Sequence, residues 1–600
     1  MPQDNANIAR HLRLMAASQP GTPALKIPRG RTTNGAIDYL SLSFRELAAE
    51  ADAWTARLQA HGVRRGDRTL VMVRPGLPLI AAAFGLFQLG AVPVIIDPGM
   101  GLKSFLACVA RSRPRALVGI PMARLVRHLF RRSFRTVEIT VPVSSSLTAR
   151  LAGQSHISNL KFEIVNSAAA DLAAVLFTSG STGAPKGVCY EHGMFEAQVR
   201  LIREAYGIQP GEVDLPLLPI FALFNPALGM TSVIPEIDPR HPAQVDPAKI
   251  VQAIQQEKVT NSFGSPTLWG KIGAHCQSHG LTLPSLRRVL CAGAPVPSAL
   301  WQSSPAWLPH GQLHSPYGAT EALPVATFSA TEALPLLAAA KPDPASPEFH
   351  LLNEALGGVP ALGTCIGRAL PGMEVRIIAI SDAPIATISD ARELPPGEVG
   401  EIIVRGPVVT KEYDALPEAT AEAKIVADSD RFPVTSDKNP APTDPSLVTS
   451  PLPLDTSSAP RAEVWHRMGD CGRLDAEGRL WFCGRKVERV ITPTGTFFTE
   501  PCEIVFRRHS KVKRCALIGL GEPGRQEPAI VIEWNAGTAE TAALAVELAQ
   551  LAASSPGTSG IRRFYYHPSF PVDVRHNAKI HRLQLARWAA TAKPVVSGDT

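Results

Sequence analysis

The feature that most constrains the fold is an alternation of helix-like and strand-like segments in the N-terminal part of the sequence. Phe44 to His61 has helical periodicity, and a short turn leads from it into the strand-like run Thr69 to Val73. A second helical segment covers Leu77 to Leu89 and ends at Gly90, after which Ala91 to Asp97 has the composition of a buried strand. Strand, helix and strand in succession predict a βαβ unit with parallel strands.

The same alternation recurs through Pro266 to Leu290, so the sequence predicts an α/β fold with mainly parallel sheets. A chain of 600 residues exceeds what one compact core usually organises, which predicts at least two domains. Hydrophobic residues make up 45% and charged residues 19% of the sequence, as in globular proteins. The formal charge of +7 is modest and comes with no long basic tail, which argues against nucleic-acid binding.

The cysteines and the apolar segments indicate the cellular compartment. The nine cysteines show neither CxxC pairs nor metal-ligand spacing, so we interpret them as reduced thiols. The N-terminus lacks the apolar core of a signal peptide, and no apolar run reaches the roughly 20 residues that a membrane span needs. We therefore expect a cytoplasmic protein without a transmembrane segment.

Two segments depart from the regular alternation. About residues 415–461, the sequence is rich in Pro, Ser, Thr and Asp without any period, and we interpret it as a surface insertion rather than a partner-binding loop. Between Arg111 and Arg135 the sequence is rich in arginine, and RLVRHLFRRSFR, from Arg124, is compatible with a basic amphipathic helix that meets anionic lipid. An ordinary solvated helix face is the favoured interpretation of this second segment.

A glycine-rich loop carries the strongest functional signal. LAAVLF is predicted to be a buried strand, and it runs directly into TSGSTGAPKG, residues Thr178 to Gly187. The glycines let backbone amides turn inward, the hydroxyl groups add donors and Lys186 adds a cation, which together suit a triphosphate. The Walker pattern GxxxxGK[ST] is not satisfied. The residues assigned to phosphate binding are Thr178, Ser179, Gly180, Ser181, Thr182, Gly183 and Lys186.

Four further motifs follow the glycine loop along the chain. They are CAGAP at Cys291–Pro295, SPYGATEA at Ser315–Ala322, VWHRMGDCGRLDAEGRLWFCGR at Val464–Arg485 and RHNAKIHR at Arg575–Arg582. Together they resemble the motifs of the ANL superfamily of adenylate-forming enzymes, over nearly the whole chain. That superfamily includes acyl-CoA synthetases, peptide-synthetase adenylation domains and luciferases. The resemblance implies that ATP and Mg²⁺ are used to turn a carboxylic acid into an acyl-adenylate with release of pyrophosphate.

The resemblance also assigns roles to single residues. Ala294 and Tyr317 would wall the adenine, the tyrosine by stacking, and Asp470 and Arg485 would contact the ribose. The remaining nucleotide-binding residues that it implies are Gly293, Pro295, Gly318 and Thr320, the last of them at a phosphate. Glu321 would hold Mg²⁺, which suits a hard cation that binds carboxylate and phosphate oxygens.

Lys579 is the residue that the resemblance places against the reacting carboxylate and the α-phosphate. Negative charge accumulates on the α-phosphate oxygens during the first step, so a cation aimed there lowers the barrier. The predicted catalytic residues are thus Lys579, Glu321 and Thr178. The resemblance further implies a large N-terminal adenylation domain of several subdomains, residues 1–484, and a small mobile α/β lid, residues 485–600, which rotates between steps.

Departures from the superfamily pattern bear on the acyl acceptor. Val487 stands near the usual hinge position, and Phe497 and Phe498 replace the thin glycine-rich loop that lines a pantetheine tunnel in thioester-forming members. Ala222 stands where many acyl-CoA synthetases have an aromatic residue or histidine beside the substrate carboxylate. The predicted substrate pocket is apolar and comprises Phe221, Ala222, Phe224 and Gly229, with Leu223, Leu228 and Met230 nearby.

IFALFNPALGMTSVIP and FPVDVRHNAKIHR resemble the β-lactone synthetases of bacterial long-chain olefin biosynthesis more closely than ordinary acyl-CoA ligases. Such an enzyme adenylates a long-chain 2-alkyl-3-hydroxy fatty acid, and the 3-hydroxyl group of the substrate then expels AMP and closes a β-lactone. Candidate bases for the hydroxyl proton are His192, His314 and His576, each of which is more commonly a packing or surface residue. Other enzymes of the same lipid pathway are candidate partners.

Two alternatives stay open at this point. The first is a fatty acyl-CoA or acyl-carrier-protein ligase whose hinge sequence has drifted. The second is a nucleotide-binding scaffold that kept the fold and lost turnover, against which the retained Lys579, Glu321 and glycine loop argue.

Overall fold

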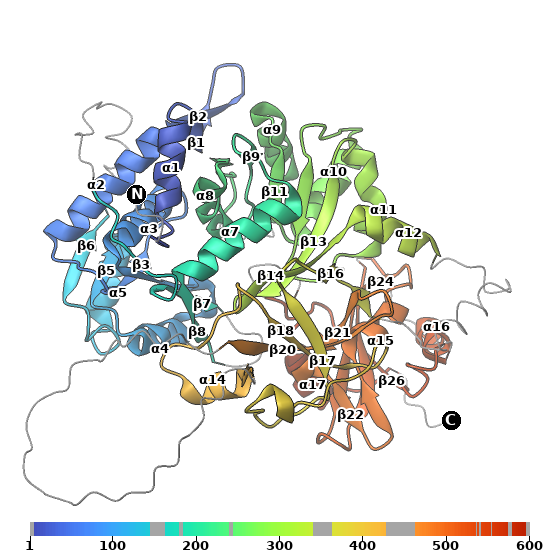
Figure 1. Ribbon diagram of the computed structural model, residues 1–600. Helices are drawn as coiled ribbons and strands as arrows, with labels where there is room; N and C mark the ends of the chain where they lie inside the picture. The colour runs from blue at the N-terminus through green and yellow to red at the C-terminus, as the bar shows by residue number, and fades with distance from the viewer. Residues whose placement is uncertain are drawn as a thin grey trace, which may run out of the picture.

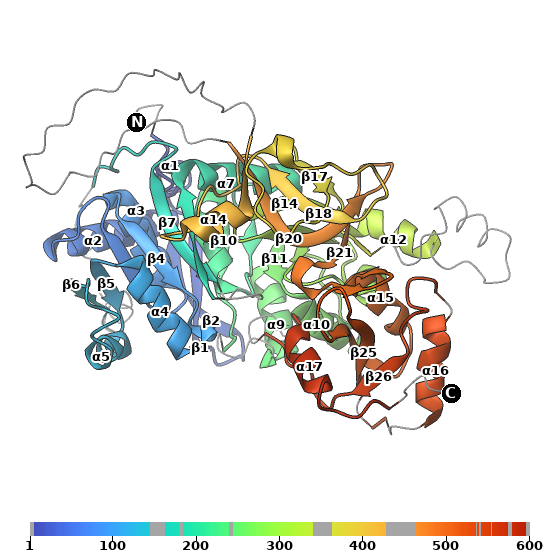
Figure 2. The ribbon, with the colours of Figure 1, turned by 90° about the horizontal axis from the view of Figure 1, so that it is seen from below.

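The computed structural model describes residues 5–143, 162–178, 184–238, 244–339, 363–427, 463–535, 537–538, 542–553, 555–573 and 579–595. Within these residues the strands form five sheets, and helices separate many of the strands along the chain (Figures 1 and 2). The predicted α/β class is confirmed.

The first sheet has six strands in the order β6-β5-β3-β4-β7-β8. β3 pairs in parallel with β4 and β5, and β4 pairs in parallel with β7, so the predicted βαβ unit is confirmed. The helix between β3 and β4 ends at Gly90, whose φ of 68° is a left-handed conformation that glycine adopts without steric cost. The elements are α2 (Phe44–Ala60), β3 (Arg68–Met72), α3 (Leu77–Leu89), β4 (Val92–Ile96), α4 (Leu102–Ser112), β5 (Ala116–Gly119), α5 (Pro121–Leu129), β6 (Ile139–Pro142), β7 (Leu172–Thr178) and β8 (Lys186–Glu191).

The second sheet has nine strands in the order β16-β14-β13-β12-β11-β9-β10-β1-β2. The run from β13 through β12, β11, β9 and β10 to β1 is parallel, and the antiparallel strands β14 and β2 flank it. The strands are β1 (Pro23–Arg31), β2 (Ile37–Ser43), β9 (Val213–Asp214), β10 (Thr231–Val233), β11 (Asn261–Gly264), β12 (Arg288–Cys291), β13 (Gln312–Ala319), β14 (Ala322–Ser329) and β16 (Arg368–Ala369). The helices are α1 (Arg10–Ser18), α7 (His192–Tyr206), α8 (Asn225–Leu228), α9 (Pro247–Glu257), α10 (Pro266–Ser278), α11 (Ser298–Trp307) and α12 (Ala330–Ala339).

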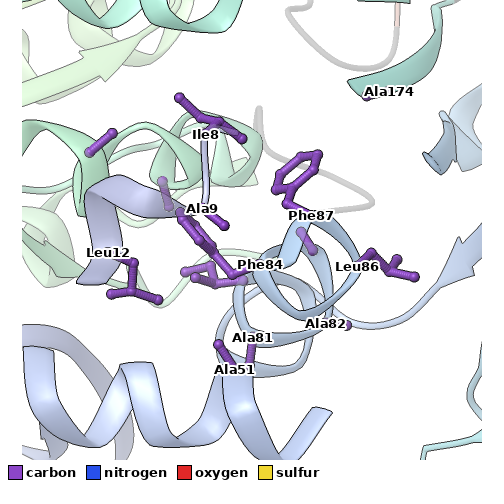
Figure 3. Close-up of a cluster of buried hydrophobic side chains, with 14 of the residues drawn as sticks. Ile8, Ala9, Leu12, Ala51, Ala81, Ala82, Phe84, Leu86, Phe87 and Ala174 are labelled. Atoms are coloured by element: carbon purple, nitrogen blue, oxygen red, sulfur yellow. The ribbon is translucent and has the colours of Figure 1, made fainter. Parts of the chain in front are cut away.

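A buried apolar cluster joins α1, α2 and α3. α3 is buried along nearly its whole length, which explains why its sequence is apolar on every face. Figure 3 shows Leu12 of α1, Ala51 of α2 and both Ala81 and Phe84 of α3 within this cluster. Ala174 of β7 belongs to the same cluster, so this packing fixes the strand from which the glycine-rich loop departs.

The third sheet is antiparallel and consists of β15 (Thr364–Cys365), β17 (Glu374–Ile378), β18 (Gly400–Arg405), β19 (Lys424–Val426), β20 (Val464–Leu474) and β21 (Leu480–Arg485). It corrects the predicted boundary of the insertion near residue 415. Residues 417–426 form α14 (Pro417–Ala423) and β19, which pairs with β20, and the β-branched residues Ile425 and Val426 favour this strand. Residues 428–461, the rest of the predicted insertion, lie outside the described residues.

The arginine-rich segment also differs from its prediction. Its helix α5 begins at Pro121, three residues before Arg124, and ends at Leu129. Proline at the start of a helix is favoured because its fixed φ suits the first turn. Arg131 to Arg135 therefore lie in turns that follow the helix.

The strands that follow Arg485 pair only among themselves in the part of the chain that the structure describes. They form β22 (Val490–Thr492), β23 (Gly495–Phe497), β24 (Val512–Leu520), β25 (Glu527–Trp534) and β26 (Arg563–Tyr566), with α15 (Thr499–Phe506), α16 (Ala542–Ala553) and α17 (Arg582–Ala589). Two apolar clusters lie wholly within this part. These features support the predicted division near Gly484, which stays a prediction.

The nine cysteines are free and buried, as expected for reduced thiols. No helix in the described ranges combines the length and the apolar character that a membrane crossing requires.

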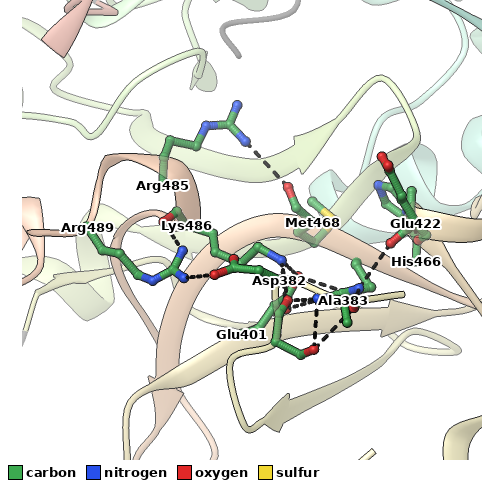
Figure 4. Close-up of polar contacts among 12 residues, drawn as sticks. Asp382, Ala383, Glu401, Glu422, His466, Met468, Arg485, Lys486 and Arg489 are labelled. Atoms are coloured by element: carbon green, nitrogen blue, oxygen red, sulfur yellow. Dashed lines mark hydrogen bonds and ion pairs between the residues drawn. The ribbon is translucent and has the colours of Figure 1, made fainter. Parts of the chain in front are cut away.

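A buried ionic cluster links the third sheet to the C-terminal part (Figure 4). Glu401 on β18 accepts two hydrogen bonds from Arg467, at 3.0 and 2.7 Å, and both of its oxygens lie 3.2 Å from Nζ of Lys486. Arg489 forms an ion pair with Asp382 at 2.6 Å. Because Glu401 and Arg467 are almost fully buried, each depends on the other for its charge.

We expect Glu401→Ala to lower the free energy of unfolding by about 3–5 kcal/mol, since it leaves two cations buried without their partner. The control is Glu374→Ala on the neighbouring strand, where Glu374 is half exposed and pairs with Arg405. That change should cost no more than about 1 kcal/mol. Urea titration followed by tryptophan fluorescence measures both, and equal losses would contradict this account.

Candidate active site

The glycine-rich loop connects β7 to β8, which form an antiparallel pair in which Thr178 faces Lys186. Arg111 of α4 donates a hydrogen bond of 2.8 Å to the carbonyl oxygen of Pro185, so the end of the loop is tied to a helix. The predicted phosphate-binding residues Ser179, Gly180, Ser181, Thr182 and Gly183 lie outside the described residues. The structure thus fixes both ends of the loop, and the roles of its residues stay predictions.

Lys186 and Glu321 both contact Tyr413. The Nζ of Lys186 lies 4.8 Å from the centre of the Tyr413 ring, and the Tyr413 hydroxyl donates a 2.8 Å hydrogen bond to Oε1 of Glu321. Residues 412–414 run beside β8, with a bridge between Val188 and Tyr413. The amide of Thr410 donates to the backbone oxygen of Glu321 at 2.8 Å. The predicted metal ligand therefore lies close to the lysine of the loop.

Asp470, Tyr317 and Arg485 form a second polar group. The Tyr317 hydroxyl donates to Oδ2 of Asp470 at 2.7 Å, and Nη1 of Arg485 lies 2.9 Å from Oδ1. Burial and then the Asp470 carboxylate raise the pKa of Tyr317, which keeps this phenol protonated as a donor. The Arg485 contact is an ion pair without hydrogen-bond alignment, and among the described residues Oδ1 of Asp470 has no aligned donor. This carboxylate thus keeps an acceptor for a ligand.

The hairpin of β13 and β14 positions the other predicted nucleotide contacts. A side chain at Gly318 would come within 2.5 Å of the backbone oxygen of Ala322, so only glycine fits this close approach. The Tyr190 hydroxyl donates to the backbone oxygen of Thr320, which anchors the turn between the strands. The predicted residues Gly293, Ala294 and Pro295 lie just after β12, the strand that pairs with β13.

One cleft, of about 3320 Å³, collects most of these residues. The predicted residues that line it are Lys186, Phe221, Phe224, Gly293, Ala294, Pro295, Tyr317, Gly318, Thr320, Glu321, Asp470, Arg485 and Lys579. Residues far apart in the sequence thus meet at one cavity, as the motif assignment predicts.

Lys579 reaches this cleft from the C-terminal part. Its amide donates to Oδ1 of Asp573 at 2.8 Å, and the amide of Asp573 donates to the backbone oxygen of Lys579 at 3.0 Å. Val572 and Ile580 form a bridge beside this pair. Residues 574–578, which include His576 and Asn577, lie outside the described residues. The ends of this segment are therefore joined directly below the lysine.

Only some of the predicted substrate-pocket residues line the cleft. Phe221 stacks on Phe263 with 3.8 Å between the ring centres, and both rings line the cleft and a second, apolar cavity of about 60 Å³. Phe224 lines both cavities as well. Ala222 instead packs in the apolar core, and Gly229 ends α8, so neither residue lines these cavities. The sequence could not show which side of this short helical segment faces inward.

Two candidate bases lie away from the cleft. His192 accepts a hydrogen bond from the amide of Ile8, and His314 packs edge-to-face on Tyr206. Burial lowers the pKa of each imidazole to about 4, as for histidines packed in a core. Neither lines the cleft, so both have the packing role that is the commoner one for histidine.

The residues near the predicted hinge have mixed surroundings. Val487 is half exposed and lines the cleft. Phe497 packs against the apolar cluster of the C-terminal part, and Phe498 precedes the first residue of α15. Neither phenylalanine lines the cleft, and their effect on a pantetheine arm stays a prediction.

Lys424 is a buried cation that sequence reasoning missed. It is 6% exposed, donates to the backbone oxygen of Thr410 and to its hydroxyl oxygen at 3.3 Å, and has Nζ 5.9 Å from the centre of the Tyr413 ring. The residue falls within the segment that was interpreted as an irregular insertion. The apolar residues on both sides of it are the available signal for a strand.

A family model described as AMP-binding enzyme matches residues 13–414. The chain belongs to this family of AMP-binding enzymes. It is 43% identical to the olefin β-lactone synthetase of Xanthomonas campestris pv. campestris, over 97% of either chain. It is 41% identical to the olefin β-lactone synthetase of Stenotrophomonas maltophilia, over 97% of this chain and 98% of that enzyme.

Two solved structures share the fold. ATP-bound MatB from Rhodopseudomonas palustris superposes with a TM-score of 0.71 at 21% identity, over 98% of this chain and 99% of its own. The amide bond synthetase McbA from Marinactinospora thermotolerans gives a TM-score of 0.70 at 21% identity, over 97% and 99%. At this identity the likeness concerns the fold, which extends over the C-terminal part as well.

Burial lowers the pKa of Lys424 from 10.5 to about 7, with Lys186 opposing the charge and Glu321 favouring it. Between about pH 7 and 10.5, Lys424 is protonated in the unfolded chain and mostly neutral in the native chain. The unfolded chain therefore binds more protons, and this group makes the free energy of unfolding rise with pH. Below about pH 7 both states are protonated and the cost of the buried ammonium group is fully present. We expect the stability of the wild type relative to Lys424→Met to rise by about 2 kcal/mol between pH 7 and 9.

Urea titrations at these pH values test the Lys424 prediction. The exposed Lys593 is the matched control, because Lys593→Met should leave the pH dependence parallel to that of the wild type. A Lys424→Met curve parallel to the wild type would show that Lys424 stays protonated throughout.

Proposed function

We propose that the chain adenylates a long-chain 2-alkyl-3-hydroxy fatty acid with ATP and Mg²⁺, releases pyrophosphate, and then closes a β-lactone with release of AMP. The observation that carries this proposal is the 43% identity to an olefin β-lactone synthetase over 97% of the chain. The cleft described above supports it, because the lysines, carboxylates and aromatic walls that two steps of adenylate chemistry need meet there.

In the nucleotide-bound state, Thr178, Lys186 and the glycine loop would bind the triphosphate, with Thr320 at a phosphate. Tyr317 and Ala294 would enclose the adenine. Asp470 would accept the ribose hydroxyls, because its Oδ1 lacks an aligned donor and its Oδ2 is held in place by Tyr317. Arg485 would add a ribose contact while it balances the charge of Asp470.

Glu321 would be a ligand of Mg²⁺. One carboxylate next to a phosphate-binding loop fits this ion, which takes one or two protein carboxylates and completes its shell with phosphate oxygens and water. The hydrogen bond from Tyr413 fixes the carboxylate, so it need not reorganise when the ion arrives. When bound, the ion would neutralise charge on the phosphates.

Lys579 would act in the first step. A carboxylate oxygen of the acid bonds to the α-phosphorus, and the bond from that phosphorus to pyrophosphate breaks. Because both reactants are anions, an ammonium group near the α-phosphate and the carboxylate lowers the repulsion between them. In the second step, the 3-hydroxyl oxygen bonds to the carbonyl carbon, AMP leaves with the bonding electrons, and the hydroxyl proton is released. Neither His192 nor His314 can take that proton where it now lies.

The apolar walls support an acid with alkyl chains. Phe221, Phe224 and Phe263 face both the cleft and the smaller cavity behind it. Apolar surface that leaves water on binding gives roughly 25 cal/mol per Å², so long alkyl chains are bound without polar partners. Apolar walls around the reacting carbonyl would also limit hydrolysis of the adenylate before ring closure.

A product assay tests the reaction directly. The enzyme receives ATP, Mg²⁺ and a 2-alkyl-3-hydroxy fatty acid, with and without coenzyme A, and the products are identified by mass spectrometry. We expect the lactone in both reactions. A thioester as the exclusive product would replace this proposal with an acyl-CoA ligase, and absence of any turnover would favour a nucleotide-binding scaffold.

We expect Lys579→Ala to reduce acid-dependent ATP–pyrophosphate exchange by about 10²- to 10³-fold, because it removes a cation aimed at developing charge. Lys593→Ala, an exposed lysine further along the C-terminal part, is the control and should retain the wild-type rate. Exchange by Lys579→Ala at the control rate would remove Lys579 from the mechanism.

A further inference from the structure

Helix α5 presents an apolar row to solvent. Met122, Leu125 and Leu129 are 61%, 49% and 64% exposed, which is unusual for large apolar side chains on a helix. Their spacing of three and four residues places them on one face. The opposite face packs inward, because Ala123 is buried and Val126 packs on the core that α4 also covers. In Figure 2, α5 lies at an outer corner of the molecule.

The surroundings of this row are basic. Residues 98–137 contain eight arginines and one lysine and no acidic residue. Three of these arginines serve the fold, since Arg111 bonds to Pro185, Arg115 to Asp67 and Arg127 to Thr140. The remaining basic side chains are exposed, and they belong to Lys103, Arg113, Arg124, Arg131, Arg132 and Arg135. An excess of this size exceeds what a solvated helix face requires, given that the whole chain carries +7.

The apolar row also adjoins the cleft. Ile120, Met122 and Ala123 are among the residues that line it, so the beginning of α5 forms part of its wall. An acid with long alkyl chains partitions into lipid rather than water. A lipid surface held at α5 would therefore place such molecules beside the cleft.

We propose that the α5 face, defined as Met122, Leu125 and Leu129 with the flanking Arg124, Arg131 and Arg132, binds an anionic lipid surface. The arginines contact the headgroups and the apolar row enters the boundary between headgroups and acyl chains. Three side chains bury too little area for a stable protein interface, which needs about 800 Å² from each partner. Charge complementarity and the apolar row together favour a lipid bilayer. Delivery of the acid from lipid rests on the proposed function, whereas attachment through the arginines and the apolar row does not.

Vesicle co-sedimentation of the full chain tests this proposal. The probes are vesicles of phosphatidylcholine alone and of phosphatidylcholine mixed with phosphatidylglycerol, at low and high salt. We expect binding to the anionic vesicles, weakened by salt, and at least about tenfold weaker binding to the neutral ones. Equal binding to both vesicle types, or no binding to either, would overturn the proposal.

Two double variants locate the contact. Arg131→Glu with Arg132→Glu should weaken vesicle binding by about 30-fold or more, and Leu125→Ser with Leu129→Ser by about tenfold. The matched controls on the C-terminal part are Arg562→Glu and Leu583→Ser, which change exposed residues of the same kinds. All four proteins should keep ATP–pyrophosphate exchange with a short, water-soluble acid, because none of these residues lines the cleft.

Vesicle binding that the two α5 variants leave unchanged would contradict the assigned surface. A change in the sedimentation of the protein alone, with no vesicle binding, would assign the α5 face to contact between copies of the chain and would likewise overturn the lipid proposal.

Discussion

The hydrogen bond from Tyr413 to Glu321 is the contact on which the arrangement of the cleft depends. It joins the turn between β13 and β14 to the segment that runs beside β8, and so connects the first sheet to the second. The Lys186 ammonium group lies over the face of the same phenol ring, 4.8 Å from its centre. Tyr413 thus contacts both the cation of the glycine loop and the predicted metal ligand, and it fixes the carboxylate through its hydroxyl.

Much of the fold could be predicted because the relevant signals are local. Gly90 ended the helix over Leu77–Leu89 in both the prediction and the structure, and the strand over LAAVLF also matched. The order of the strands could not be predicted, because β9 and β11 pair across nearly fifty residues. The start of the insertion was placed too early, since proline-rich composition outweighed the three residues of β19.

The candidate site divides in the same way. The motifs predicted residues that meet in one cleft, such as Asp470 and Tyr317, because each of these residues belongs to a short sequence motif. Lys424 could not be found, because its role comes from burial against Tyr413 and not from any motif. Histidines were misleading candidates for the same reason, since His314 owes its neutral state to packing. Burial is decided by the tertiary fold, and single residues do not reveal it.

The two hydrogen bonds between Asp573 and Lys579 bear on how fast Lys579 can reach the cleft. Two hydrogen bonds join Asp573 to Lys579, so a separate movement of the Lys579 backbone would have to break both. Val572 and Ile580 beside these bonds pack on the apolar cluster of β24 and β25, so a displacement that keeps these contacts carries the sheet with it. In the proposed mechanism, delivery of the ammonium group would then follow microsecond-to-millisecond rigid-body motion rather than faster loop fluctuation. A single concerted rearrangement would in this way set the pace at which the charge is delivered.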